Sequence, residues 1–63
     1  MGNKVKEKRL ELKLSQEELS KRADISRNTI AKIESGQDLN LTKFTMQAIA
    51  NALGTSVTEI FFF

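Results

Sequence analysis

The chain has 63 residues, which predicts a single small domain over residues 1–63. It contains no Cys and no His, and this composition excludes disulfides, Cys/His zinc sites and catalysis by a thiol or an imidazole. With no Pro and only three Gly, helices with short connections are favoured over a turn-rich β fold. No apolar run approaches a membrane span and no apolar signal segment opens the chain, so a soluble, cytoplasmic protein is expected.

The net charge of +2 comes from ten basic and eight acidic residues. All ten Lys and Arg lie within residues 1–43, and Glu59 is the only charged residue of 44–63. A basic field over the N-terminal two-thirds fits an anionic partner such as nucleic acid. A solvated Lys/Glu surface explains the same charges, and on charge alone it is the better explanation.

The first of five expected short helices covers about residues 3–12. Asn3 can cap this helix, because an Asn side chain accepts a hydrogen bond from a free amide of the first turn. Apolar spacing predicts one buried stripe along it, which holds Val5, Arg9 and Leu12.

Residues 15–35 predict two helices joined by a tight turn. Ser15 and Glu18 have the spacing of a capping box, in which each side chain bonds to the other residue's amide. Asp24 is the candidate for a left-handed turn residue, because Asp tolerates that conformation better than most residues. The next helix begins at the cap residue Ser26 and ends before Gly36, and its buried positions are Ile30 and Ile33.

The C-terminal third predicts two more helices. The first is capped by Asn40 or Thr42, which the sequence does not separate, and it ends before Gly54. Ser56 and Glu59 have the spacing of a second capping box and open a short last helix.

Two short helices joined by a tight turn form a helix-turn-helix. Residues 14–36 (LSQEELSKRADISRNTIAKIESG) resemble the helix-turn-helix of the Cro and lambdoid phage repressor family, also called XRE-type regulators, and residues 48–61 (AIANALGTSVTEIF) resemble the end of the same domain. The resemblance extends over residues 4–61 and implies an all-α, lambda-repressor-like bundle of five short helices. It also implies a sequence-specific regulator of transcription, a repressor. No enzymatic activity and no cofactor are expected, because the sequence shows no paired acids around a cleft, no Gly-rich phosphate loop and no metal-ligand spacing.

The resemblance implies that double-stranded DNA is the partner. It assigns the reading of base edges in the major groove to Arg27, Asn28 and Lys32. An Arg fork suits guanine and an Asn amide suits adenine, while Lys32 reaches either guanine or a phosphate. Phosphate contacts are expected from residues that flank this surface, namely Ser15, Gln16, Ser26, Ser35 and Lys43. The alternative is that all of these are ordinary solvated side chains.

Arg9 and Glu34 match a family pair that joins the first and third helices as an ion pair. Their expected role is therefore structural, although Arg9 also has the option of facing the DNA backbone. The chain departs from the family at two turns where Gly is common, and these positions hold Lys13 and Asp24. The loop over residues 37–40 lacks the usual basic residues and Pro, which leaves Lys43 as the nearest basic candidate.

A homodimer on a palindromic operator is expected, because one such domain covers half a site and a two-fold dimer places recognition helices about 34 Å apart. Phe61 is expected in the core, so the candidate dimer contacts are Phe62 and Phe63. A frayed or truncated end is the alternative. Leu39 and Leu41 either join that interface or pack under the fourth helix. The rival functions are an antitoxin-like or protein-binding subunit and the DNA-binding fragment of a larger regulator. No membrane and no small-molecule ligand is expected as a partner.

Overall fold

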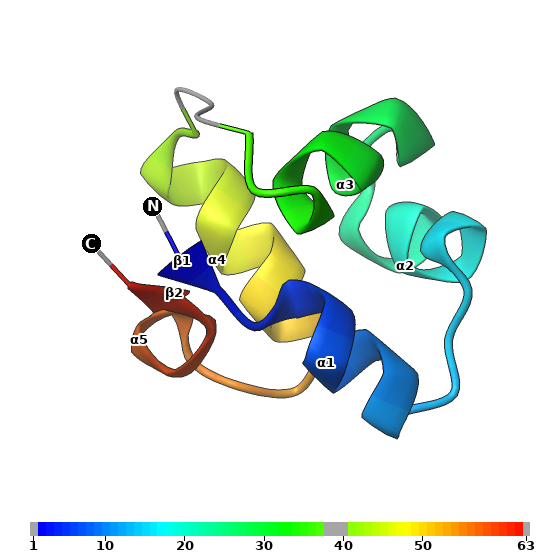
Figure 1. Cartoon of the computed structure of the whole chain (residues 1–63), viewed down its shortest axis with the longest axis horizontal. Helices are drawn as coiled ribbons and strands as arrows, with labels where there is room; N and C mark the ends of the chain where they lie inside the picture. The colour runs from blue at the N-terminus through cyan, green and yellow to red at the C-terminus, as the bar shows by residue number, and fades with distance from the viewer. Residues whose placement is uncertain (1, 38–40, 63) are drawn as a thin grey trace.

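Five helices and one very short pair of strands form this computed structural model, which describes residues 2–37 and 41–62 (Figure 1). In chain order the elements are β1 (Gly2–Asn3), α1 (Val5–Glu11), α2 (Gln16–Ala23), α3 (Arg27–Glu34), α4 (Lys43–Ala52), α5 (Val57–Ile60) and β2 (Phe61–Phe62). The predicted all-α bundle of five short helices is confirmed. Its one addition is an antiparallel ribbon in which Gly2 pairs with Phe62 and Asn3 with Phe61.

α1 begins at Val5, two residues after the expected start at Asn3. Asn3 pairs with Phe61 in the ribbon, while its Oδ1 still accepts a hydrogen bond from the Val5 amide at 3.2 Å. The expected buried stripe is wrong at its end, because Leu12 is 45% exposed and Leu14 is buried in its place. Leu12 lies beyond the last helical residue, and the turn that follows it directs Leu14 into the core.

Four helices end in the same way. In each, one residue takes the left-handed conformation, and the amide of the next residue bonds to the carbonyl five residues earlier. This arrangement is the Schellman motif. The left-handed residues are Lys13, Asp24, Gly36 and Gly54, with φ of 58°, 56°, 81° and 67°. The left-handed turn predicted at Asp24 is thus confirmed.

Local caps set the starts of α2, α3 and α4. The capping box of α2 is confirmed, because the Ser15 hydroxyl accepts from the Glu18 amide at 3.0 Å and the Ser15 amide donates to Glu18 Oε1 at 2.9 Å. The hydroxyl of Ser26 accepts from the amide three residues later in α3. Thr42 caps α4 in the same manner, while the other candidate, Asn40, lies outside the described residues.

The second predicted capping box, at the start of α5, is wrong. The Ser56 hydroxyl donates to Glu59 Oε1 at 3.0 Å and does not accept from the Glu59 amide. That amide donates instead to the Ser56 carbonyl, at 3.2 Å, in a tighter turn. The spacing of the two residues is therefore right, but the tighter turn directs the Glu59 amide to the Ser56 carbonyl and away from the Ser56 hydroxyl.

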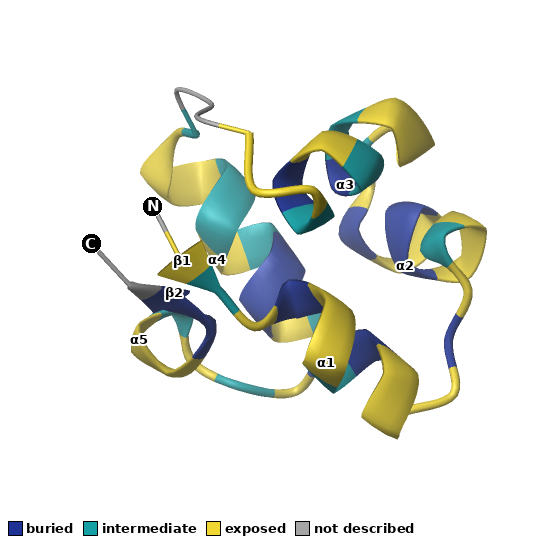
Figure 2. Ribbon diagram, viewed as in Figure 1, coloured by how far each residue is buried: buried dark blue, intermediate teal, exposed yellow. Residues whose placement is uncertain are grey.

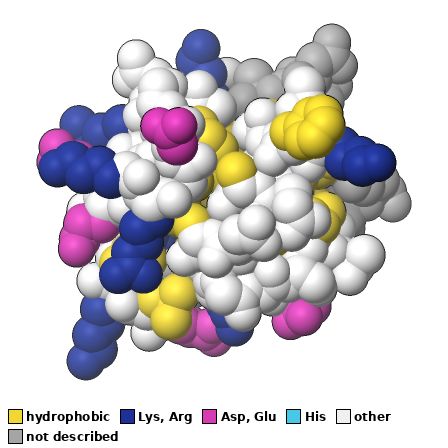
Figure 3. Space-filling model, turned by 180° about the vertical axis from the view of Figure 1, so that it is seen from behind, with side chains coloured by type: hydrophobic (Ala, Val, Ile, Leu, Met, Phe, Trp, Pro, Cys, Tyr) yellow, Lys and Arg dark blue, Asp and Glu magenta, His cyan; other side chains and the backbone are white. Residues whose placement is uncertain are grey.

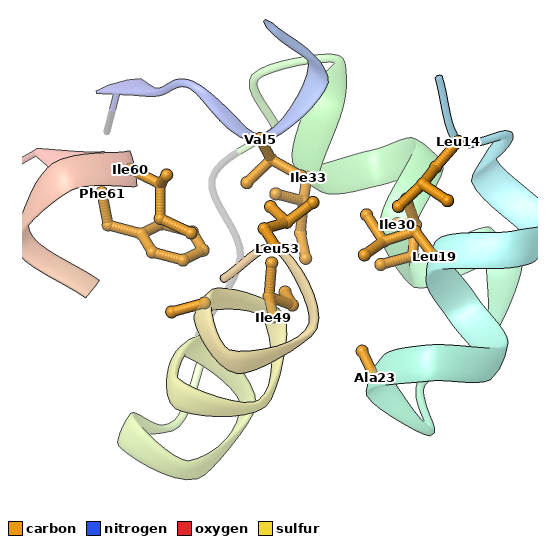
Figure 4. Close-up of a cluster of buried hydrophobic side chains, with 11 residues drawn as sticks. Val5, Leu14, Leu19, Ala23, Ile30, Ile33, Ile49, Leu53, Ile60 and Phe61 are labelled. Atoms are coloured by element: carbon orange, nitrogen blue, oxygen red, sulfur yellow. The ribbon is translucent and has the colours of Figure 1, made fainter. Parts of the chain in front are cut away.

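The core lies between α4 and the three helices that precede it. Figure 4 shows Ile49 of α4 and Leu53, the residue that follows α4, pointing toward Val5 of α1 and Ile33 of α3. Phe61 closes the same cluster and is 4% exposed, as expected. Leu41 is half-buried against this core, whereas Leu39 lies outside the described residues. Within residues 2–37 and 41–62, no helix combines the length and apolar character that a membrane crossing requires.

Candidate nucleic-acid interface

The α2–α3 unit is held by a close crossing and a tight turn. Ser20 is buried on α2, and its hydroxyl donates to the Glu17 carbonyl at 2.7 Å, so the side chain folds back on its own helix. Asp24, at φ 56° and ψ 45°, then reverses the chain within three residues. Ile30 and Ile33, both 0% exposed, fix the inner side of α3.

The outer side of α3 carries polar residues that are free to meet a ligand. Arg27, Asn28 and Lys32 are exposed, as is Ser35 at the helix end (Figure 2). At about 100° per residue, these four positions span about 140° of the helix circumference. Among residues 2–37 and 41–62, no hydrogen bond or ion pair holds the side chains of Arg27, Asn28 and Lys32. α3 is therefore anchored on one side and open on the other.

The serines predicted to contact phosphates are already engaged in caps. Ser15 and Ser26 accept amide hydrogen bonds through their hydroxyl oxygens, and Ser26 also shares a 2.8 Å contact with the Thr29 hydroxyl. The Ser35 hydroxyl donates to the Lys32 carbonyl at 2.9 Å. Among the described residues, the Ser15 hydroxyl has no hydrogen bond to another hydroxyl or to a carbonyl, so of the three serines it has the proton most available to an anion.

Lys43 and Phe44 begin α4, at the other end of the loop that follows α3 (Figure 1). Lys43 is exposed, and Phe44 is 83% exposed, which is unusual for an aromatic residue. Phe44 was not among the residues expected in the interface. Helical spacing is the signal that could have found it, because at about 100° per residue Phe44 lies about 160° around the helix from Met46, opposite the apolar stripe of α4.

A buried ionic cluster lies behind the α2–α3 unit. Arg9 of α1 donates to both oxygens of Glu34, with Nε 2.8 Å from Oε2 and Nη2 3.0 Å from Oε1. Its Nη1 donates to the Leu14 carbonyl at 2.7 Å. The hydrogen bond to Glu34 raises the pKa of the Arg9 guanidinium above its ordinary value. The ion pair implied by the family resemblance is therefore present, and it fastens α1 to the end of α3.

Gln16 joins the same cluster, a contact that the sequence did not predict. Its Nε2 donates to Glu34 Oε1 at 3.2 Å, and the residue is half-buried at the first position of α2. Gln16 and Glu34 are 18 positions apart and lie on different helices, so only the crossing of α2 and α3 brings them together.

The charge of the α2–α3 unit is balanced. Residues 15–35 hold four basic and four acidic residues, and one of the acids, Glu34, is neutralised by Arg9. Figure 3 shows basic side chains interspersed with acidic ones on the side of the molecule where Figure 1 places α2. Among the described residues, no group of His, Cys, Asp and Glu could hold a metal ion. Affinity for an anion must therefore come from a few specific side-chain contacts rather than from a strong positive electrostatic potential over the whole unit.

The predicted dimer contacts fall at the edge of the described chain. The backbone of Phe62 pairs with Gly2 in the β1–β2 ribbon. Phe63 lies outside the described residues.

A tight left-handed turn, two buried isoleucines and an open polar side on the second helix define a helix-turn-helix domain. A family model described as helix-turn-helix matches residues 5–60. The chain therefore belongs to the helix-turn-helix family, in its Cro and lambdoid repressor (XRE) type, whose members are DNA-binding regulators of transcription.

One curated relative matches almost the whole chain. It is the immunity repressor protein of Bacillus phage phi105, which is 38% identical over 60 residues. The match covers 95% of this chain and 41% of the relative, so the chain spans about two-fifths of that protein's length. The comparison with solved structures found no match.

Proposed function

We propose that residues 1–63 act as one domain that binds double-stranded DNA sequence-specifically and represses transcription, with α3 inserted into the major groove. The observation that carries the proposal is the division of α3 into two sides. Ile30 and Ile33 are completely buried, and three polar side chains without partners among the described residues stand opposite: Arg27, Asn28 and Lys32. Burial fixes the helix axis, so the open side meets a groove in one orientation.

Base recognition is assigned by the chemistry of these three side chains. The Arg27 guanidinium matches the O6 and N7 acceptors of guanine, and the Asn28 amide matches N7 and the amino group of adenine. Lys32, one turn further along α3, reaches guanine or a phosphate. Each bidentate contact discriminates against a wrong base by about 1–3 kcal/mol.

Phosphate contacts are assigned to residues around that helix. Gln16 and Ser15 stand at the start of α2, where free backbone amides favour an anion. Lys43 opens α4 and supplies the nearest positive charge after the loop. Ser26 and Ser35 stand at the two ends of α3 and complete the set. These contacts position the domain and add affinity without carrying sequence information.

A homodimer on a palindromic operator is the assembly that we propose, because one recognition helix reads only half of such a site. Phe62 and Phe63 are the residues proposed to join the subunits. A second candidate is the DNA-binding part of a longer regulator, and the 41% coverage of the phage repressor favours it. Sedimentation separates the two, because a dimer that dissociates when Phe62 and Phe63 are deleted supports the first. A chain that is monomeric throughout supports the second.

The test of DNA binding is selection of bound sequences from random duplex DNA by the 63-residue chain. The expected outcome is an enriched half-site containing guanine and adenine at adjacent positions. Two inverted copies whose centres are about 10 base pairs apart are expected if the chain dimerises on DNA. Recovery of unenriched sequence after repeated rounds would contradict the proposal.

A further inference from the structure

Glu34 is the meeting point of three helices. Its Oε1 accepts from Arg9 Nη2 at 3.0 Å and from Gln16 Nε2 at 3.2 Å, while its Oε2 accepts from Arg9 Nε at 2.8 Å. The Glu34 side chain is only 4% exposed. One buried carboxylate thus binds the Arg9 guanidinium of α1. The oxygen Oε1 of this carboxylate also accepts a hydrogen bond from Gln16, the first residue of α2.

This contact fixes which end of the Gln16 amide faces which way. An ionised carboxylate only accepts hydrogen bonds, so Gln16 must turn its amino group, and not its carbonyl, toward Glu34. The amino group has two protons, and Glu34 takes one of them. The second proton remains available to another acceptor, and Gln16 is only half-buried, so solvent and ligands can reach it.

A phosphate oxygen is also purely an acceptor, so it can bind Gln16 only through an N–H. An amide free to turn over by 180° would present its carbonyl to the phosphate in part of the population. The contact with Glu34 removes that orientation before DNA arrives. Holding a donor in its bound geometry in advance lowers the entropy cost of binding.

We propose that Glu34 is a positioning residue for a phosphate contact made by Gln16, in addition to its ion pair with Arg9. The inference rests on the proposed DNA-binding function and deepens it. Because phosphate contacts carry no sequence information, Glu34 acts equally on all DNA sequences. Because Gln16 is neutral, its contact releases no counterion, and the salt dependence of binding stays unchanged.

A double-mutant cycle separates this role from the stabilising role of Glu34. The parent, Gln16→Ala, Glu34→Gln and the double variant are compared at a temperature where circular dichroism shows all four to be folded. Glu34→Gln leaves one acceptor oxygen in place of two, so Arg9 and Gln16 compete for it. The dissociation constant for one duplex is measured by fluorescence anisotropy at several salt concentrations.

The positioning role predicts that Glu34→Gln weakens binding about fivefold in the parent, which is the entropy cost of immobilising one flexible side chain on binding. In the Gln16→Ala background the same change has less than about a twofold effect, and the salt slope is the same in all four proteins. An equal loss in both backgrounds would overturn the proposal, because Glu34 would then act only through the fold.

A second measurement needs neither DNA nor a substitution. In the free parent chain, nuclear relaxation of the side-chain amides should show the Gln16 amino group more ordered than that of Gln37, which is exposed. Equal mobility of the two amides would overturn the positioning role. If the parent binds no duplex at all, the proposed function fails, and relaxation still decides whether Glu34 orients Gln16.

Discussion

Arg9 binds Glu34 in a bidentate manner, with hydrogen bonds of 2.8 and 3.0 Å to the two carboxylate oxygens. The two side chains are 9% and 4% exposed, so the pair lies in the interior although the domain is small. It joins α1 to the last residue of α3 and leaves the opposite side of α3 open. The residues that anchor α3 are therefore different from the residues proposed to contact DNA bases.

Arg9→Met is expected to destabilise the domain by about 3–5 kcal/mol, because it leaves the buried Glu34 carboxylate without its cationic partner. Glu34→Ala should likewise lower stability more than it alters preference among DNA sequences. Urea denaturation measures the loss. The matched control is Glu11→Ala, which removes an exposed partner 3.4 Å from Lys8 and should cost less than about 1 kcal/mol. Equal losses for Arg9→Met and Glu11→Ala would contradict the buried role.

Acidification should weaken the start of α2. The pKa of Glu18 lies below its ordinary 4.5, first because the Ser15 amide donates to the carboxylate and second because of the Ser15 hydroxyl. A carboxyl with a lowered folded-state pKa stabilises the fold fully above the unfolded-state pKa, and this contribution is lost as the pH falls through the folded-state value. The advantage of the parent over Glu18→Gln should therefore be largest near neutral pH and shrink steadily below about pH 4.5.

The measurement for Glu18 is thermal unfolding of both proteins across that pH range. Subtracting one curve from the other removes the contributions of the other carboxylates. A difference that stays constant from neutral to acidic pH would show that the charge of Glu18 plays no part in the cap.

Lys13→Gly should stabilise the domain by about 0.5–1 kcal/mol. Lys13 has φ 58°, a conformation that costs an ordinary residue about 1–2 kcal/mol, and glycine recovers this in spite of its greater freedom in the unfolded chain. Its side chain is exposed, so few contacts are lost. Lys13→Ala is the control, since it removes the same charge but keeps the Cβ. Denaturation midpoints that rise equally for both variants would contradict the backbone explanation.

Two phenylalanines, one buried and one exposed, allow the effect of burial on stability to be compared for the same substitution. Phe61 is 4% exposed, and Phe61→Ala should cost about 3–5 kcal/mol through a cavity in the core. Phe44 is 83% exposed, and Phe44→Ala should change stability by less than about 0.5 kcal/mol. Thermal unfolding of the isolated chain measures both. A large loss for Phe44→Ala would show that this ring is covered, for example in a dimer.

The parts of this fold that the sequence predicted depend on short-range chemistry. The Ser15–Glu18 capping box and the left-handed Asp24 each involve neighbours on one turn, so their geometry follows from residue type and spacing. The Ser56–Glu59 box failed although its spacing is the same, because α5 starts with a tighter turn in which the Glu59 amide bonds to the Ser56 carbonyl. Residue spacing does not distinguish the two kinds of turn.

Two contacts between distant parts of the chain escaped prediction, whereas the Arg9–Glu34 ion pair was expected only from the family resemblance. The ribbon that pairs Asn3 with Phe61 contains only two residues in each strand, too few for a periodic pattern. The contact of Gln16 with Glu34 depends on where α2 crosses α3, which no local rule supplies. The base and phosphate contacts assigned from the resemblance stay predictions, and so do the dimer contacts inferred from the apolar end of the chain.

The most direct test of the account is the combined replacement Arg27→Ala, Asn28→Ala and Lys32→Ala, assayed for binding to the selected operator and to scrambled duplex. All three side chains are exposed, so the variant should keep the parent's circular dichroism and unfold at nearly the same temperature. We expect the variant to bind both duplexes with the same weak affinity. A folded variant that still prefers the operator as strongly as the parent would contradict major-groove recognition by α3.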